Sequence, residues 1–409
     1  MRASNPYTVT ASGGAYQTPN WSVPFTTRRY DAIGRTLTIT NTDSTTQNFA
    51  YNQWATTFTD ANNHQRQTIA DAYGRINQVK EFNLGSTYTT NYAYDRLNRL
   101  TQVTDHAGNV TTMGYDWLGR KLTMSDPDMG SWDYRYDNAG NLIKQRDARN
   151  QATCFYYDEL NRLRGKTYHP NIADQTALNN LVCTGTWAVT YTYDAGTNQK
   201  GRRTGMSDAS GSTSWTYDVQ GRVLSRTDTI TGASAYTTQW TYDAMSRVRT
   251  MAYPDGEQVA TTYNAQGLPA TLGTYITASS YSAASQLTSL TFGNNVVTTN
   301  YTYHAENLRL MQLTTTNNLQ NLSYQYDNVG NVTKITDVLR NNEETRYEYD
   351  NLDRLKKAYI TGVYTQEWDY TAIGNINWRK DNGVTTSYTY NPSTRPHAVM
   401  QVEIGRAHV

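Results

Sequence analysis

The chain has 409 residues and a formal net charge of +1, with 36 Lys and Arg residues against 35 Asp and Glu residues. This balance gives no electrostatic reason to expect a nucleic acid or an anionic membrane as a partner. No stretch approaches the run of about 18 apolar residues that spans a membrane, and the opening MRASNPYTVT lacks the apolar centre of a signal peptide. We therefore expect neither nucleic-acid binding nor membrane insertion.

The composition predicts a folded, sheet-rich protein. Leu, Ile, Val and Phe are scarce, but the net charge is near zero, and the 34 tyrosines lift the aromatic share to 12%. Disordered chains usually combine high net charge with few aromatic residues. Tyrosine and threonine favour half-buried strands. We expect thin aromatic contacts rather than a thick aliphatic core, and very little helix.

A Tyr-Asp (YD) repeat runs along the chain in order. It begins with YDAIGR at Tyr30 and ADAYGR around Asp71, and it then recurs every 21 residues at Tyr94, Tyr115, Tyr136 and Tyr157. Later copies, some of them degenerate, follow at Tyr193, Tyr217, Tyr242, Tyr263, Tyr281, Tyr303, Tyr326, Tyr349, Tyr370 and Tyr390. A period of this kind indicates a repeat architecture. We predict a single repeat array over residues 1–402.

The aspartate of each pair is predicted to open a turn. DAIG (Asp31–Gly34), DWLG (Asp116–Gly119) and DNAG (Asp137–Gly140) place Asp first and Gly fourth, as a type I turn prefers. Intervening turns such as DHAG (Asp105–Gly108) follow the same pattern. Where Gly is missing, the fourth residue is Asn98, Asn161, Ser246, Asn307 or Asp353. Except for Ser246, these residues tolerate the left-handed backbone that closes a hairpin. We interpret the aspartate as bonding its own backbone.

The segments between turns are predicted strands. They hold about six residues, a normal strand length, and in SWDYRYD the residues Trp132, Tyr134 and Tyr136 alternate with polar neighbours. A period of two gives the strand an aromatic face and a polar face. We predict an all-β fold of continuous antiparallel hairpins that stack into a long twisted strip. The shortage of aliphatic residues favours a strip that spirals into a partial hollow shell.

One segment departs from the repeat. Between Arg164 and Val189 the spacing of the YD tyrosines expands, and ADQTALNNLV (Ala173–Val182) is predicted to form a short helical turn within a loop. A passive loop is the favoured interpretation, although insertions in repeat arrays can carry contacts. Cys154 and Cys183 cannot make a disulfide framework and lack metal-ligand spacing.

The YDxxGRL units resemble the YD repeats of the Rhs (rearrangement hot spot) family, whose relatives include insecticidal toxin complexes and animal teneurins. The resemblance covers nearly the whole chain, and NPSTRPHAV (Asn391–Val399) resembles the lead-in to the family's core region. It implies a non-enzymatic shell that is secreted or at the cell surface and encloses a C-terminal toxin polypeptide. Secretion-system or cell-surface components are further partners that it implies. No stretch matches the family's Asp-bearing cleavage motif, so only the scaffold role is carried over.

Structural roles account for the candidate reactive and binding residues better than functional ones do. A catalytic Tyr-Asp couple is disfavoured because chemistry needs one perturbed constellation, not many interchangeable copies. An adhesin that stacks sugars or protein on exposed tyrosines is the main alternative function, and a Ser-His-Asp hydrolase is a remote one. Asp126–Asp128 lacks the spacing of a calcium loop. No catalytic, cofactor-binding or metal-ligating residue, and no cofactor, is predicted.

The histidines and the arginines after the turns are the remaining candidate ligands. The histidines never form close pairs in the sequence, which disfavours a zinc site; they are His64, His106, His169, His304, His397 and His408. The arginines that follow the turns are predicted to pair with nearby aspartates rather than to bind phosphates; they are Arg35, Arg75, Arg99, Arg120, Arg162, Arg222, Arg247 and Arg354.

The last seven residues break the repeat pattern. EIGRAHV (Glu403–Val409) equals one translation of a common sequencing adapter, GAG ATC GGA AGA GCA CAC GTC. We expect residues 403–409 to be a non-native tail on a piece of a longer gene.

Overall fold

The computed structural model describes residues 2–7, 20, 22–293 and 296–405, which form 35 strands and two short helices. The first strands are β1 (Arg2–Ser4), β2 (Phe25–Tyr30), β3 (Thr36–Thr40), β4 (Thr46–Asn52), β5 (Ala55–Thr59), β6 (Gln65–Ala70), β7 (Ile76–Asn83), β8 (Ser86–Tyr94) and β9 (Leu100–Thr104).

The middle of the chain continues with β10 (Val110–Tyr115), β11 (Lys121–Asp126), β12 (Gly130–Tyr136), β13 (Leu142–Arg146), β14 (Ala152–Tyr157), β15 (Leu163–His169), the helix α1 (Gln175–Asn180), β16 (Val189–Tyr193), β17 (Arg203–Asp208), β18 (Gly211–Tyr217), β19 (Val223–Ile230), β20 (Ala235–Tyr242), β21 (Val248–Ala252), β22 (Gln258–Tyr263), β23 (Pro269–Leu272) and β24 (Ile276–Tyr281). The last part holds β25 (Leu287–Phe292), β26 (Thr298–Tyr303), β27 (Leu310–Thr315), β28 (Gln320–Tyr326), β29 (Val332–Asp337), the 3-10 helix η1 (Val338–Arg340), β30 (Glu343–Tyr349), β31 (Leu355–Ile360), β32 (Tyr364–Tyr370), β33 (Ile376–Asp381), β34 (Val384–Asn391) and β35 (Arg395–Ile404).

Strands pair in the order of the chain. β18 pairs with β19 and β19 with β20, each antiparallel, and the same holds for β30 with β31 and β31 with β32. In the hairpins that carry the YD pair, the register shifts by one residue at the tyrosine, as between Gln325 and Tyr326. A type I turn closed by a left-handed residue and a bulge is a common three-residue hairpin loop. The predicted all-β fold of continuous antiparallel hairpins is confirmed.

The strip has almost no aliphatic interior. The buried apolar side chains among the described residues are few; they are Val79, Ala152, Cys154, Leu178, Val259 and Ala358. Most strand positions are half-buried, as expected from the Tyr- and Thr-rich composition. Hydrophobic burial therefore contributes little to the stability of this fold. The contacts between neighbouring repeats contribute a larger share of the stability than they would in an ordinary domain.

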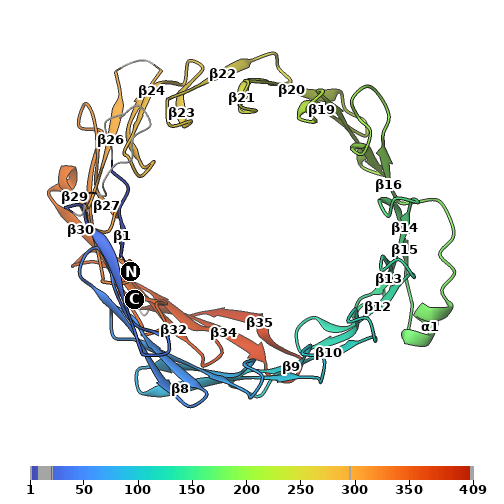
Figure 1. Ribbon diagram of the computed structural model, residues 1–409, viewed down its shortest axis with the longest axis horizontal. Coiled ribbons are helices and arrows are strands. Elements are labelled where there is room, and N and C mark those ends of the chain that lie inside the picture. Colours follow the sequence, from blue (N-terminus) through green and yellow to red (C-terminus); the bar gives the residue numbers. More distant parts are fainter. Residues whose placement is uncertain (1, 8–19, 21, 294–295, 406–409) are drawn as a thin grey trace. The chain divides into compact units, whose positions relative to one another are not determined.

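The chain divides into two compact units. Unit 1 comprises residues 1–110 and 278–409, and unit 2 comprises residues 111–277. Within unit 1, the hairpins near the start of the chain lie beside hairpins near its end, the blue and the orange-to-red strands of Figure 1. Hydrogen bonds such as that from Asn62 to Asp327 join residues 265 positions apart.

The irregular segment of unit 2 is tied to the sheet. The predicted helical turn is confirmed as α1, which starts after the cap residue Asp174 and buries Leu178 completely. Cys154, on β14, forms a disulfide with Cys183, just beyond the helix. Sequence reasoning gave these cysteines no role, because a spacing of 29 residues does not by itself bring two thiols together.

One predicted turn position is wrong. The turn after Tyr303 is one residue longer than its equivalents, so Leu308 and not Asn307 takes the left-handed backbone, with φ of 59°. The backbone N–H of Leu308 donates to the carbonyl of His304, at 2.9 Å. Ser246, which fitted the pattern less well, does adopt the left-handed region, with φ of 64°.

The end of the described chain still follows the sheet. In β35, Glu403 pairs with Ser387 and Ile404 with Thr386 on β34. Arg406–Val409, the rest of the expected non-native tail, lie outside the described residues. The helices found in the described part of the chain are too short to cross a bilayer.

Candidate functional site: the repeat coupling and the seam

Most YD turns are closed by their own aspartate. In the turn at Asp116, Oδ1 accepts the backbone N–H groups of Leu118 and Arg120, both at 2.9 Å, and Oδ2 accepts the Arg120 guanidinium at 2.6 Å. The predicted local pairing of the arginines is confirmed, because all of them form this ion pair; the pairs are Arg35–Asp31, Arg75–Asp71, Arg99–Asp95, Arg120–Asp116, Arg162–Asp158, Arg222–Asp218, Arg247–Asp243 and Arg354–Asp350.

The arginine also reaches the next repeat. Arg120 donates to the backbone carbonyl of Asp137 at 2.8 Å, and its guanidinium lies 4.9 Å from the ring centre of Tyr136. The same cation–π contact recurs along the strip at 4.1–4.9 Å, as in the pairs Arg35–Tyr51, Arg75–Tyr94, Arg162–Tyr193, Arg222–Tyr242, Arg247–Tyr263 and Arg354–Tyr370. Stacked guanidinium groups of this kind contribute about 0.5–1 kcal/mol at exposed sites.

The tyrosine hydroxyl completes the coupling. Tyr136 donates to the carbonyl of Lys121, the residue that follows the arginine of the preceding repeat, at 3.0 Å. Equivalent bonds of 2.6–3.0 Å are made by Tyr51, Tyr94, Tyr157, Tyr193, Tyr217, Tyr242, Tyr263, Tyr303, Tyr326, Tyr349, Tyr370 and Tyr390. The recurrent contact of ring and hydroxyl, joined by a guanidinium where the preceding turn ends in arginine, therefore couples one repeat to the next. We call this arrangement the repeat coupling.

Electrostatics keep the repeat coupling in one protonation state. The Arg35 guanidinium and nearby backbone N–H groups hold the pKa of Asp31 below its usual value, and the N–H and guanidinium of Arg99 do the same to the pKa of Asp95. Burial raises the pKa of the tyrosines, as at Tyr136 and Tyr349. At neutral pH the carboxylate is ionised and the phenol neutral, which suits a fixed structural pair.

A second set of contacts joins the two segments of unit 1. Asn83 donates its amide to Asp350 Oδ2 at 3.2 Å, and its side-chain oxygen accepts the backbone N–H of Asn351 at 3.1 Å. Asn62 repeats this arrangement on the preceding turn, with Asp327 at 3.0 Å and the N–H of Asn328 at 3.2 Å. One asparagine thus binds a YD turn through both its donor and its acceptor. We call the line of contacts between residues 41–109 and residues 304–397 the seam.

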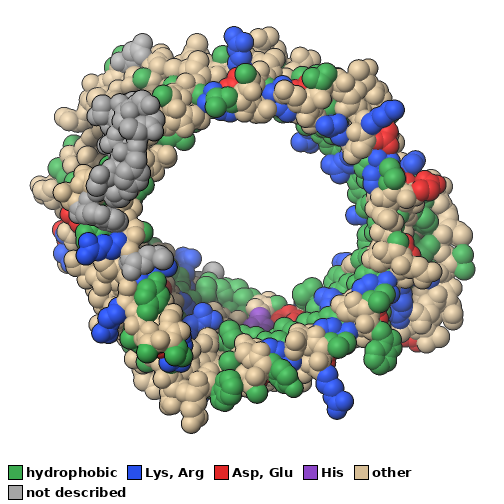
Figure 2. Space-filling view, viewed as in Figure 1, with side chains coloured by type: hydrophobic (Ala, Val, Ile, Leu, Met, Phe, Trp, Pro, Cys, Tyr) green, Lys and Arg blue, Asp and Glu red, His purple; other side chains and the backbone are tan. Residues whose placement is uncertain are grey.

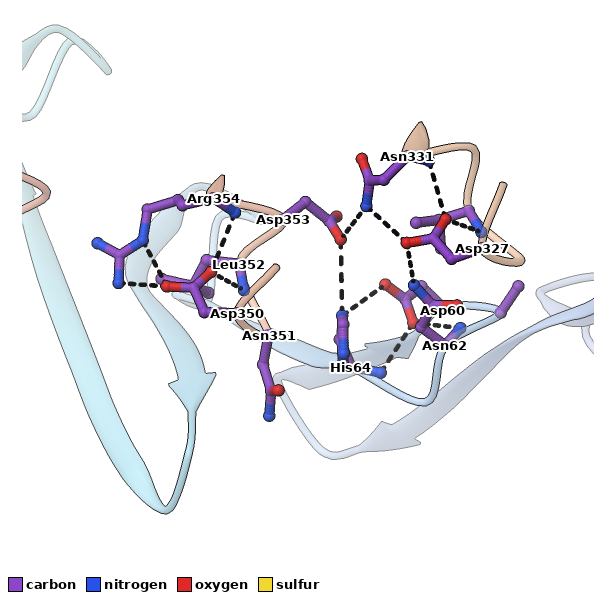
Figure 3. A network of polar contacts seen from close by, with 12 residues as sticks. Asp60, Asn62, His64, Asp327, Asn331, Asp350, Asn351, Leu352, Asp353 and Arg354 are labelled. Atoms are coloured by element: carbon purple, nitrogen blue, oxygen red, sulfur yellow. Dashed lines mark hydrogen bonds and ion pairs between the residues drawn. The ribbon is translucent and has the colours of Figure 1, made fainter. Parts of the chain in front are cut away.

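The seam contains a dense polar network (Figure 3). Asn331 donates one amide group to both Asp327 Oδ2 and Asp353 Oδ1, each at 2.9 Å. Burial alone would raise the pKa of Asp327, but hydrogen bonds from Asn331, Gly330 and Asn62 outweigh it and lower that pKa. Asp350, only 2% exposed, also has a lowered pKa because bonds from Arg354 and Leu352 outweigh its burial.

The histidines have different surroundings. His64 and His397 lie on the seam, and His397 Nε2 is 3.2 Å from Asp105 Oδ2. His106 Nδ1 accepts the backbone N–H of Thr89, and His169 bonds Thr167 within its own strand. His304 lies in the turn after β26, and His408 is outside the described residues. Sequence spacing could not place His64 beside Asp353, because the two residues are 289 positions apart.

Other predicted positions serve as turns or loop tips. Asp126 Oδ1 accepts the N–H groups of Asp128 and Met129, as a turn aspartate does. Among the described residues, the most exposed aromatic residues are not the YD tyrosines but residues at turn tips, such as Trp117 at 94% and Tyr73 at 80%. In Figure 2, Lys and Arg side chains are scattered among neutral polar groups and do not form one basic field.

Comparisons with known proteins agree with this geometry. The family model described as RHS Repeat matches residues 84–128 and 198–229. Among curated proteins, no match was found. The solved structure of TcdB2-TccC3-Cdc42 has a TM-score of 0.80 and 20% identity, over 92% of this chain and 23% of that one. The structure of TcdB2-TccC3 gives the same values, and that of the Photorhabdus luminescens Tc holotoxin pore has a TM-score of 0.79 and 20% identity, over 92% of this chain and 22% of that one.

The chain thus spans less than a quarter of the length of the solved chains that it matches. At this level of identity the likeness describes the fold, and the repeats in the two matched segments carry the family assignment. Taken together with the repeat coupling, these findings show that the chain carries Rhs (YD) repeats and has the β-hairpin fold seen in the TccC3-containing structures.

Proposed function

We propose that the chain is a stretch of the wall of an Rhs-type toxin shell, a non-enzymatic scaffold that spirals around a toxin polypeptide and keeps it from the producing cell. The seam is the observation that carries this proposal most directly. The YD turns at Asp327 and Asp350 are satisfied within their own repeats, yet each aspartate also accepts the side-chain amide of an asparagine 265–267 residues away. The next backbone N–H of each turn donates to the side-chain oxygen of that same asparagine. A strip whose edges join in this way can build a continuous wall.

The chemistry of the repeat coupling supports a structural role. In the copy built on Asp116, Arg120 and Tyr136, all three side chains are engaged with one another or with backbone. Most copies repeat this pattern, with an amide in place of the arginine in some of them, as at Asn331. A wall that holds a cargo through many weak contacts needs no single reactive pocket. One of the matched structures is that of a Tc holotoxin pore, which supports a toxin polypeptide as the partner and secretion as the route.

The alternative of a glycan-binding adhesin has less support. Sugar stacking needs an open aromatic face, whereas the rings of the YD tyrosines at positions 94, 136, 242 and 370 lie under an arginine of the preceding repeat. A glycan array with the purified chain tests the alternative, since sugar binding that is lost on replacing Tyr73 or Trp117 would favour it.

The container proposal is tested with the whole natural gene in which this sequence occurs. We expect a toxin polypeptide encoded after the repeats to resist protease while the shell is intact. The double variant Asn62→Ala, Asn83→Ala weakens the seam and should make that polypeptide cleavable. The control Asn77→Ala, near the start of the strand β7 that ends at Asn83, should not. A following polypeptide that is cleaved equally fast in the wild type and in the seam variant would refute the proposal.

A further inference from the structure

The seam brings together two carboxylates and an imidazole from distant parts of the chain. Asp60 and His64 lie at the two ends of the turn between β5 and β6, and Asp353 lies in the turn between β30 and β31 (Figure 3). His64 Nδ1 is 3.6 Å from Asp60 Oδ2 and 3.7 Å from Asp353 Oδ1. The three side-chain atoms all lie within 4.8 Å of one another.

The imidazole nitrogen has no hydrogen-bond partner among the described residues. His64 Nδ1 is shielded from solvent, and its distances to the two carboxylate oxygens exceed those of a hydrogen bond. A buried polar atom without a partner is unfavourable. Something more than these three side chains is therefore needed to satisfy Nδ1.

We propose that this cluster binds a divalent transition-metal ion of the zinc type, with Asp60 Oδ2, His64 Nδ1 and Asp353 Oδ1 as its protein ligands. Zinc–ligand distances of about 2.0–2.2 Å place two tetrahedral ligands roughly 3.4 Å apart. The observed separations from Nδ1 exceed this value by only a few tenths of an ångström. One imidazole with two carboxylates suits such an ion better than Mg²⁺ or Ca²⁺, which prefer oxygen ligands alone.

The surrounding residues orient the ligands. Asp60 Oδ1 accepts the N–H groups of Asn62 and His64, both at 2.8 Å, and this leaves Oδ2 facing the imidazole. Asp353 Oδ1 is held by the Asn331 amide at 2.9 Å. Partners of this kind fix the direction of metal ligands and tune their affinity.

The site also has room and access for a metal-bound water. A cavity of about 220 Å³ adjoins it, lined by all three ligands together with Arg66, Glu81 and other residues. The Asp353 side chain is 41% exposed, so an ion can enter from solvent. The charge of Arg66 is opposed by Glu81, its neighbour across the strands, and the nearby Arg354 is paired with Asp350. The carboxylates of the cluster therefore keep their attraction for a cation.

An ion at this position links the two segments of unit 1. His64 and Asp353 are 289 residues apart, and the ion adds a bond between their turns to the asparagine contacts of the seam. The strength of the seam should then depend on metal. This inference does not rest on a toxin cargo and holds or fails independently of it.

The test uses the 409-residue chain freed of metal by a chelator, and it measures Zn²⁺ binding by calorimetry. We expect one ion per chain and slower hydrogen exchange in the turns at 60–64 and 350–354 when Zn²⁺ is bound. Loss of a residue that supports a metal ligand typically lowers metal affinity about 10–100-fold. Replacement of a ligand itself should lower the Zn²⁺ affinity by at least this much.

Two variants and a control make the test specific. In Asp353→Asn, the side-chain oxygen can still accept the Asn331 amide, and asparagine tolerates the φ of 60° at this position. His64→Gln removes the imidazole. Both should lose the tight site. His397→Gln, which removes another histidine of the seam, should retain it. Equal Zn²⁺ affinity in all four proteins overturns the proposal. Anomalous scattering from wild-type crystals at the zinc edge needs no variant, and a zinc peak elsewhere with none at His64 overturns it as well.

Discussion

Replacement of Asp350 by alanine tests the seam and the turn together. Asp350 is 2% exposed and accepts four donors: the backbone N–H groups of Leu352 and Arg354, the Arg354 guanidinium at 2.7 Å and the Asn83 amide at 3.2 Å. Breaking a buried ion pair costs about 3–5 kcal/mol. The Arg354 side chain is 19% exposed and can recover some hydration, so we expect Asp350→Ala to lower the free energy of unfolding by about 3 kcal/mol.

The loss should be local as well as large. Urea unfolding of the chain reports the overall change, and hydrogen exchange of peptides around residues 83 and 350–354 reports the seam. Asp350→Asn keeps the acceptor for the two N–H groups and should lose less than Asp350→Ala. Asp31→Ala, in an equivalent turn with a more exposed carboxylate, should also cost less and leave exchange at the seam unchanged. Equal losses in Asp31→Ala and Asp350→Ala, or unchanged exchange around Asn83, would refute this reasoning.

Three further predictions concern other parts of the chain. Cys183→Ser should loosen the segment around α1 and lower the free energy of unfolding by about 3–4 kcal/mol, because the disulfide closes a loop of 29 residues. In thermal melts, a reductant should destabilise the wild type by a similar amount and leave the variant unchanged. Gly165→Ala places a methyl group against the Trp187 ring and should cost about 1–3 kcal/mol in urea unfolding, whereas Gly74→Ala meets no neighbouring atom and should show only the smaller cost of its left-handed backbone. The pH dependence of stability follows from the lowered pKa values of the aspartates and the raised pKa values of the tyrosines. The carboxylates stabilise the fold above about pH 4, and this stabilisation is lost as the pH falls through their folded pKa values. The phenols stabilise the fold below about pH 10, and this stabilisation is lost as the pH rises through their folded pKa values. Thermal melts that are flat across both limits would contradict this assignment.

The local structure was predictable because each turn is specified within a few residues. Asp at the first position and Gly or Asn at the fourth define the hairpin loop, and alternation of aromatic and polar residues defines the strands. Pattern reasoning erred at Asn307 because one extra residue in that turn moves the left-handed position to Leu308. It also interpreted the YD tyrosines as cross-strand packing and did not find their hydroxyl bonds to the preceding repeat. The recurrence of a tyrosine one repeat after most turn arginines was the signal that could have revealed them, although the separation varies from 16 residues for Arg120 and Tyr136 to 31 for Arg162 and Tyr193.

The seam could not be predicted, since no local rule relates residues more than 260 positions apart. Asn62 and Asn83 look like ordinary turn residues, and only the structure places them against Asp327 and Asp350. The cluster around His64 escaped for the same reason, because one of its carboxylates comes from the other end of unit 1.

Tyrosine-to-phenylalanine substitution at several repeats tests most directly whether the YD pair has a structural role. The variants Tyr136→Phe, Tyr242→Phe, Tyr349→Phe and Tyr370→Phe each remove one hydroxyl bond to the preceding repeat and keep the ring under its neighbours. We predict that each lowers the free energy of unfolding by about 0.5–1.5 kcal/mol, and that distant pairs add to within about 0.5 kcal/mol. Tyr236→Phe, on a ring that is 46% exposed, should stay within about 0.5 kcal/mol of the wild type. Four variants as stable as Tyr236→Phe, or one variant that accounts for the whole effect, would contradict a coupling shared equally among the repeats.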